Sequence, residues 1–108
     1  MAWFRRRGRK ARSTLDRVAY QADFDHLEQF AHTRRGVEAY LEPRTTVTET
    51  TVVLIADDGE WTRRRVPNAS VARQWAHRMG IPIYEVMLMG YPQRMRDFNA
   101  RRKRAEQP

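Results

Sequence analysis

The stretch TTVTETTVVLIADDGEWTRRRV, residues 45–66, decides the fold. Residues 51–56 are apolar almost without interruption and rich in Val and Ile, which predicts a strand covered on both faces. Asp57, Asp58 and Gly59 tolerate the backbone angles of a tight turn. Because residues 61–66 can then return antiparallel, we predict a central β-hairpin over residues 44–66.

Two further strands flank this hairpin in the sequence. Residues 37–42 alternate, with Val37, Ala39 and Leu41 on one side, which predicts a half-buried strand that Pro43 ends. Residues 81–86 predict a short fourth strand, which Pro82 confines to a strand start or an edge. The arginines at 63–65 indicate that residues 61–66 form an edge strand, since charge there discourages pairing with other chains.

Helix signals fill the rest of the chain. Residues 13–16 match a capping box, which predicts a helix over 14–22, and a second helical segment runs over 24–35 and ends at Gly36. The pattern leaves open whether these are one kinked helix or two. A further helix follows Pro67, with Asn68 or Ser70 as its cap and Trp75 in its apolar stripe. A last helix begins at Pro92.

These elements predict the α+β class. We expect an antiparallel three-stranded meander, with a candidate fourth short strand, packed on one face against two or three helices. The predicted organisation is a disordered basic arm over residues 1–12, a single globular domain over 13–93, and a basic C-terminal helix and tail over 94–108.

Positive charge is concentrated at the two ends. The 108-residue chain has a net charge of +8, yet residues 13–93 carry nine basic and eleven acidic side chains. Residues 1–12 carry six basic and no acidic ones. All but two of the 21 basic residues are Arg, which suits bidentate contact with phosphate, although a GC-rich coding sequence would give the same bias.

No catalytic, cofactor or metal motif is present in the sequence. The five glycines form no G-x-G pair, both serines stand at predicted helix starts, and the chain has no cysteine. We therefore predict no catalytic residue, no cofactor and no metal. Because the basic start lacks the apolar stretch of a signal peptide, and no run is long enough to span a membrane, we predict a cytoplasmic protein.

Residues 34–66, with GIPIYEV at 80–86 and GYPQRMRDFNARRKR at 90–104, resemble a family of small, uncharacterised actinobacterial proteins. The resemblance covers about residues 25–104 and implies no catalytic or binding residues. Separately, the helix-strand-strand-strand-helix order of residues 24–79 is similar to that of a double-stranded RNA-binding domain. That domain has a cluster of lysines at the start of its second helix, where this sequence offers only Arg73.

The charge pattern predicts a non-enzymatic accessory protein that binds RNA or a ribonucleoprotein through its Arg-rich ends. Trp3 and Phe4 could stack or insert, and Trp61 shares a strand face with two arginines, as in a base-stacking platform. The predicted nucleic-acid-binding residues are Arg5, Arg6, Arg7, Arg9, Lys10, Arg12, Arg63, Arg65, Arg101, Arg102, Lys103 and Arg104.

Three alternatives remain open at this stage. The charged tails could merely solubilise a small domain. They could bind an anionic membrane surface, with Trp3 and Phe4 in the interface. An enzyme of the kind labelled oxidoreductase, without a recognisable cofactor motif, could instead use a pocket between Tyr84 and Tyr91. The sequence leaves the oligomeric state undetermined.

Overall fold

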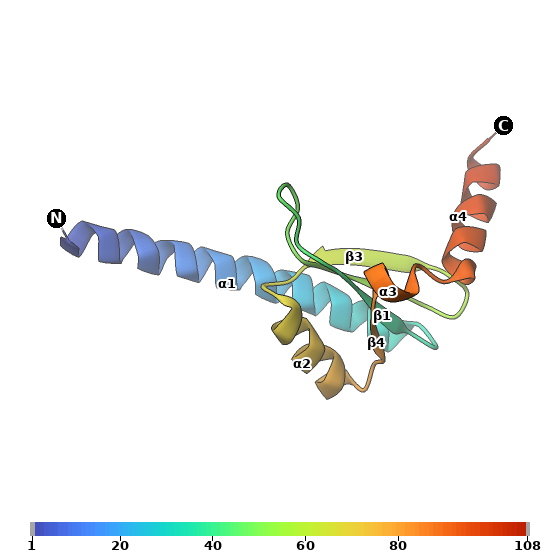
Figure 1. The fold of residues 1–108 in the computed structure, drawn as a ribbon, viewed down its shortest axis with the longest axis horizontal. Coiled ribbons are helices and arrows are strands. Elements are labelled where there is room, and N and C mark those ends of the chain that lie inside the picture. The colour runs from blue at the N-terminus through green and yellow to red at the C-terminus, as the bar shows by residue number, and fades with distance from the viewer. Residues whose placement is uncertain (1, 108) are drawn as a thin grey trace.

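The computed structural model describes the backbone of residues 2–107 and the side chains of residues 16–107. A four-stranded sheet forms the centre, with α1 and α2 on one side and α4 projecting from the other (Figure 1). The elements are α1 (Ala2–Thr33), β1 (Glu38–Glu42), β2 (Thr51–Ile55), β3 (Trp61–Arg65), α2 (Ala69–Met79), β4 (Ile83–Glu85), α3 (Val86–Met89) and α4 (Gln93–Glu106).

The sheet has the strand order β3-β2-β1-β4. The pairs β1–β2 and β2–β3 are antiparallel, as the meander prediction requires, and β3 lies at an edge. The fourth strand, however, pairs in parallel with β1, and Ala39 lies opposite Ile83. The sheet is therefore mixed rather than an antiparallel meander alone, because α2 crosses back and returns the chain to the far edge in the direction of β1.

The hairpin predicted over residues 44–66 begins later in the structure. β2 begins only at Thr51, and residues 45–49 form an exposed loop. The backbone N–H of Thr45 donates to the carbonyl oxygen of Thr48, and the Thr45 hydroxyl accepts from the Thr48 N–H at 3.0 Å. This side chain satisfies backbone groups locally, which favours a turn over a continued strand.

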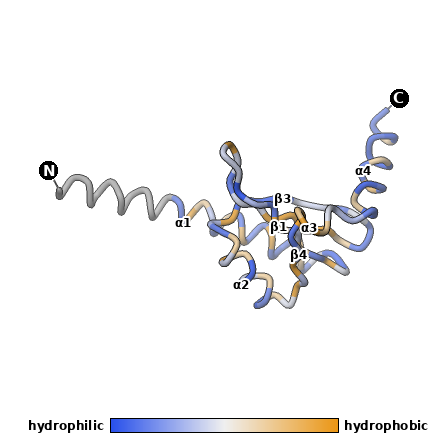
Figure 2. The backbone as a smooth tube through the Cα atoms, viewed as in Figure 1, coloured by the Kyte–Doolittle hydropathy of each residue, from blue (hydrophilic) through white to orange (hydrophobic). Residues whose placement is uncertain are grey.

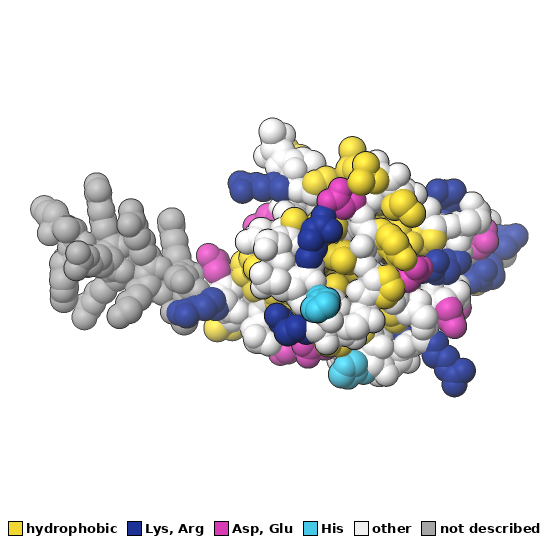
Figure 3. Space-filling model, turned by 60° about the horizontal axis from the view of Figure 1, so that its bottom comes forward, with side chains coloured by type: hydrophobic (Ala, Val, Ile, Leu, Met, Phe, Trp, Pro, Cys, Tyr) yellow, Lys and Arg dark blue, Asp and Glu magenta, His cyan; other side chains and the backbone are white. Residues whose placement is uncertain are grey.

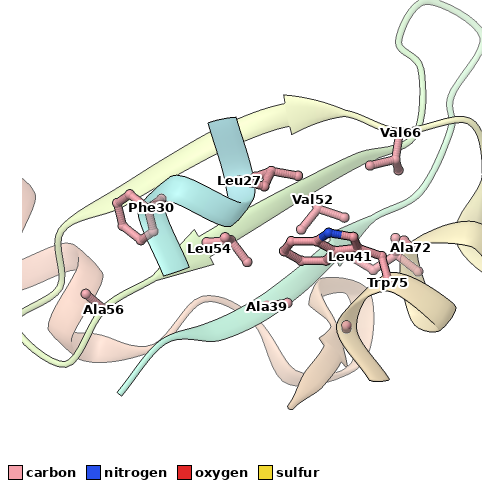
Figure 4. Packing of buried hydrophobic residues seen from close by; sticks show 11 residues of the cluster. Leu27, Phe30, Ala39, Leu41, Val52, Leu54, Ala56, Val66, Ala72 and Trp75 are labelled. Carbon is pink, nitrogen blue, oxygen red and sulfur yellow. The ribbon is translucent and has the colours of Figure 1, made fainter. Parts of the chain in front are cut away.

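The first core lies between the sheet and helices α1 and α2. Leu27 and Phe30 of α1 point onto the sheet, while Trp75 of α2 lies over Leu41 and Val52 (Figure 4). All of these side chains are buried. The helical segment predicted over residues 24–35 therefore contributes directly to the core.

A second, smaller core covers the opposite face of the sheet. Val53 and Ile55 are fully buried there against Tyr40 and against Met95 of α4. The prediction that strand 51–56 is covered on both faces is confirmed, whereas the expectation that helices pack on one face only is wrong. The physical reason is that the chain after β4 turns back across the second face and places Met95 on it.

The N-terminal helical segments form a single helix, α1, which ends at Thr33. Gly36 follows with a positive φ of 62°, close to the expected stop. Helix α1 extends back to Ala2, through residues 1–12 for which we expected a disordered arm. Arg, Lys and Ala are good helix formers, which is consistent with this extension. The side chains of residues 1–15 lie outside the described residues, so the behaviour of the arm stays a prediction.

Helix α2 has the predicted cap, since the Asn68 side chain accepts from the N–H of Val71 at 2.9 Å. It ends at Gly80, which has a φ of 68°. Its fully buried residues are Ala72, Trp75 and Ala76. Short helix α3 was not predicted, because four apolar residues in succession carry no helical period.

Candidate nucleic-acid interface

The arginines of the globular body are largely used in ion pairs within the fold. Residues 16–100 carry eleven basic and twelve acidic side chains, so the body is nearly neutral. Arg34, for example, donates to both carboxylate oxygens of Glu60, at 3.2 and 3.1 Å. Six arginines of the body form such pairs: Arg34, Arg63, Arg64, Arg65, Arg73 and Arg94.

Arg63, a predicted nucleic-acid-binding residue, belongs to a half-buried network. It donates twice to the carboxylate of Glu42, at 2.7 and 3.0 Å, and Glu42 also accepts from the hydroxyls of Thr51 and Tyr91. Burial alone would raise the pKa of Glu42, but the hydrogen bonds from Arg63, Thr51 and Tyr91 outweigh it and hold this pKa below its ordinary value. Burial and the Glu42 carboxylate raise the pKa of Tyr91. The network therefore fixes an ionised Glu42 and a neutral Tyr91.

Arg65, the other predicted binding residue on β3, is also paired. Its guanidinium lies 3.3 Å from Glu49 and 3.8 Å from Asp23, and it stacks on the ring of Tyr20. The guanidinium of Arg63 lies over Trp61, at 5.2 Å from the ring centroid. Both arginines of the base-stacking platform predicted on β3 are thus ion-paired within the fold, and stacking of a base on Trp61 stays a prediction.

A polar cleft of about 330 Å³ between α1 and β3 contains His26 and Thr62. The Nε2 atom of His26 lies 2.6 Å from the Thr62 hydroxyl oxygen, while Arg64 donates to Nδ1 at 3.4 Å. Because a guanidinium only donates, Nδ1 is the acceptor and the neutral imidazole carries its proton on Nε2. Burial, followed by the charge of Arg64, lowers the pKa of His26. Such an imidazole donates to Thr62 and does not activate it as a nucleophile.

The inner end of α4 is anchored to the sheet and to the β2–β3 turn. Arg94 forms an ion pair with Glu38 and donates to the carbonyl oxygen of Ala56 at 2.9 Å. Gly59 is essential to this approach, because a Cβ atom at its position would lie 2.0 Å from the carbonyl oxygen of Arg94. Asn99 accepts from the indole N–H of Trp61 at 2.8 Å.

The outer part of α4 carries the predicted binding residues Arg101, Arg102, Lys103 and Arg104 together. Residues 99–107 are all exposed, and most residues of this segment are hydrophilic (Figure 2). Arg101 donates to the carbonyl oxygen of Asp58 at 2.9 Å, and Arg102 pairs with Glu106 at 3.4 Å. Within the part of the chain whose side chains are described, Lys103 and Arg104 have no side-chain partner.

The two basic ends lie at opposite ends of the molecule (Figure 1). The long axis of the Cα trace measures 59 Å. Arg5, Arg6, Arg7, Arg9, Lys10 and Arg12 lie outside the residues whose side chains are described, as do Trp3 and Phe4. The backbone of α1 therefore begins at the opposite end of the molecule from the outer part of α4.

A second surface feature is apolar and was not predicted. Met87, Leu88 and Met89 of α3 are all exposed, Leu88 to 80%, and hydrophobic side chains gather on the face drawn in Figure 3. A hollow of about 430 Å³ lies between α3 and the 45–49 loop, lined by Val86, Met87, Glu42, Arg63 and Thr45 among others. Tyr84 and Tyr91, the walls of the predicted enzyme pocket, pack instead against the second core.

Among the described residues no group of His, Cys, Asp and Glu is arranged to hold a metal ion. In the same part of the chain, no helix combines the length and the hydropathy needed to span a bilayer. Comparisons with family models, with curated proteins and with solved structures found no match to this chain.

The sequence reasoning missed the residues that seat α4, namely Asn99, Asp58 and Glu38. Each of them bonds a residue at least 38 positions away, so no local spacing could have indicated the contact. The one available signal was Gly59, since a glycine that ends a run of two acidic turn residues permits a close approach as well as a turn.

Proposed function

We propose that the protein is a non-enzymatic accessory protein that binds RNA, or a ribonucleoprotein, through phosphate contacts at its basic ends. One observation carries the proposal. The body uses its arginines in ion pairs within the fold, whereas the outer part of α4 presents four successive cations that are exposed to solvent. Of these four, Lys103 and Arg104 form no hydrogen bond or ion pair with the described residues, so their charge is available to a partner.

Phosphate is the partner chemistry that best fits these cations. Arg predominates among them, and its planar guanidinium can donate two parallel hydrogen bonds to a phosphate. Neutralising phosphates releases condensed counterions, which supplies binding free energy without regard to base sequence. The nearly neutral body adds little to this attraction and serves to hold the two ends apart.

The separation of the ends favours a long polyanion over a small ligand. One compact phosphate compound could contact α4, whereas a long polyanion could also extend along the molecule toward the start of α1. An RNA strand or a ribonucleoprotein surface can contact both ends. We therefore include the arm cations, at positions 5–7, 9, 10 and 12, in the proposed interface.

Salt dependence tests the proposal. If the arm neutralises about six phosphates, the affinity for single-stranded RNA contains an arm contribution to the log-log salt slope of about −4. Deleting residues 1–12 should flatten the slope by most of this amount. The measurement compares the full-length and truncated proteins between about 50 and 200 mM salt. Equal salt slopes for the two proteins would show that the arm does not contact RNA phosphates. Negligible RNA affinity in both proteins at the lowest salt would refute the proposed function.

The exposed apolar side chains of α3 favour a second candidate, a peripheral contact with an anionic membrane. Met87, Leu88 and Met89 could enter the interface while basic side chains contact lipid headgroups. Flotation with liposomes that contain or lack anionic lipid separates the two candidates. Flotation only with anionic lipid, together with no RNA affinity, would favour the membrane.

A further inference from the structure

The outer part of α4, from residue 99 onward, is bonded to the body through Asn99 and Arg101, and no hydrogen bond or ion pair joins the described residues after Arg101 to the body. The last buried residue of α4 is Met95, and every residue from 99 to 107 is exposed. In Figure 1 this part of α4 projects away from the sheet. A partner can therefore contact it from more than one side.

The cations on this part of α4 point in different directions. Successive residues of an α-helix are rotated by about 100° around the axis, so the side chains of Arg102 and Arg104 leave the helix about 200° apart. They stand on nearly opposite sides, with Lys103 between them. Arg101 is held toward the body by its bond to the Asp58 carbonyl oxygen.

The positions of these cations favour some forms of RNA over others. A single strand that lies along one side of the helix can place phosphates against Arg102 or against Arg104, but not against both. The groove of a double helix has a phosphate backbone on each wall, so a helix inserted into it can contact phosphates on both sides. Cations on opposite sides therefore match a groove better than a strand.

Groove width narrows the choice further. An α-helix with its side chains is about 10–12 Å across, which is close to the width of about 12 Å of the B-form major groove. The major groove of regular A-form RNA is too narrow and deep for side chains to read. A bulge interrupts the stacking and opens that groove, so an RNA partner would have to present a bulged stem.

We infer that the outer part of α4 enters the major groove of an RNA stem opened by a bulge, with Arg102 and Arg104 facing phosphates on its two walls. The inference rests on the proposed function, because RNA as the partner is what excludes the regular groove. Beyond that function, the inference specifies the shape of the RNA and the groove wall that each of the two arginines contacts.

The test uses two matched variants of the full chain, Arg102→Gln and Arg104→Gln. Both are made in a protein that already carries Glu106→Gln. Glu106 pairs with Arg102, and without this change the loss of Arg102 would also release a carboxylate, whereas the loss of Arg104 would not. The probes are a hairpin RNA with a pyrimidine bulge in its stem, the same stem without the bulge, a single strand of equal length and a B-form DNA duplex of the stem sequence.

On the bulged stem, each substitution should flatten the log-log salt slope by about 0.9, the value for one duplex phosphate. The regular RNA stem should bind roughly tenfold more weakly, because its groove excludes the helix. On the single strand, only one of the two substitutions should change the slope.

The inference would be overturned if only one of the two arginine substitutions changed the salt slope on the bulged stem. It would also be overturned if the protein bound the DNA duplex or the regular RNA stem most tightly. As long as an RNA probe still binds in these cases, the proposed function survives, whereas binding of the DNA duplex without any RNA affinity would refute it as well. Loss of affinity for every probe at low salt would instead refute the proposed function itself.

Discussion

The globular body and the outer part of α4 use the same residue type in opposite ways. In the body, Arg63 and Arg94 are held against carboxylates that are themselves half-buried, so their positions are fixed by the fold. On outer α4, Lys103 and Arg104 are exposed and form no hydrogen bond or ion pair within the described residues. The difference teaches that an arginine count alone does not locate a binding surface, since much of the charge is required for folding.

The comparison predicts that changes in the body alter stability and spare RNA affinity, while changes on outer α4 do the reverse. The following four predictions test this separation, in order of decreasing effect on stability.

Trp75→Ala should lower the free energy of unfolding by about 3–5 kcal/mol, because it leaves a cavity between α2 and the sheet. Trp75 is buried against Leu41 and Val52 and contacts the ring of Phe24, with centroids 5.9 Å apart. Urea denaturation followed by circular dichroism gives the value.

Trp75→Phe is the matched control. The indole Nε1 of Trp75 is buried and makes no hydrogen bond, so the smaller ring removes an unsatisfied donor along with some packing. We expect a smaller loss than for alanine. A loss below about 1 kcal/mol for the alanine variant would show that α2 does not form part of the core as described.

Glu42→Gln should lower the free energy of unfolding by about 1–3 kcal/mol, because it removes the charge that Arg63, Thr51 and Tyr91 all bond. Glu49→Gln is the matched control. Glu49 pairs with Arg65, but its side chain is 52% exposed, against 17% for Glu42. We expect the control to change stability by less than about 0.5 kcal/mol.

The same carboxylate predicts a pH dependence. The pKa of Glu42 in the folded protein lies below its ordinary value of 4.5, so the unfolded chain takes up a proton first as the pH falls. Its contribution to stability is present above pH 4.5 and is lost as the pH drops through the folded pKa. Unfolding measured between neutral and acidic pH should show a smaller loss in Glu42→Gln than in the unchanged protein. An equal loss of stability in the two proteins would contradict the lowered pKa of Glu42.

Deleting residues 102–108 should change the free energy of unfolding by less than about 0.5 kcal/mol, because these side chains bury no apolar surface and the one ion pair is exposed. RNA affinity should fall at the same time. Thermal unfolding and RNA titration of one preparation give both values. A large loss of stability would mean that outer α4 supports the fold, and the contrast with the body would then fail.

The success of sequence reasoning differs between elements for a physical reason. Strand 51–56 was predicted with both faces covered, and the structure buries Val52, Val53, Leu54 and Ile55 completely, because an unbroken apolar run is a local signal. The parallel pairing of β4 could not be predicted, since it depends on where α2 crosses. The covering of the second face was missed because Met95 comes from a helix that is otherwise polar.

The sequence by itself determined the order of the four strands and of helices α1, α2 and α4, the turn at residues 57–60 and the concentration of positive charge at the two ends. These properties follow from local period, turn chemistry and composition. Only the tertiary structure decided which arginines are used within the fold. Arg63 on β3 bonds Glu42 on β1, with β2 between them, and Arg94 bonds Glu38, which lies 56 residues away in the sequence. Contacts between residues so far apart in the sequence arise from packing and not from any spacing along the chain.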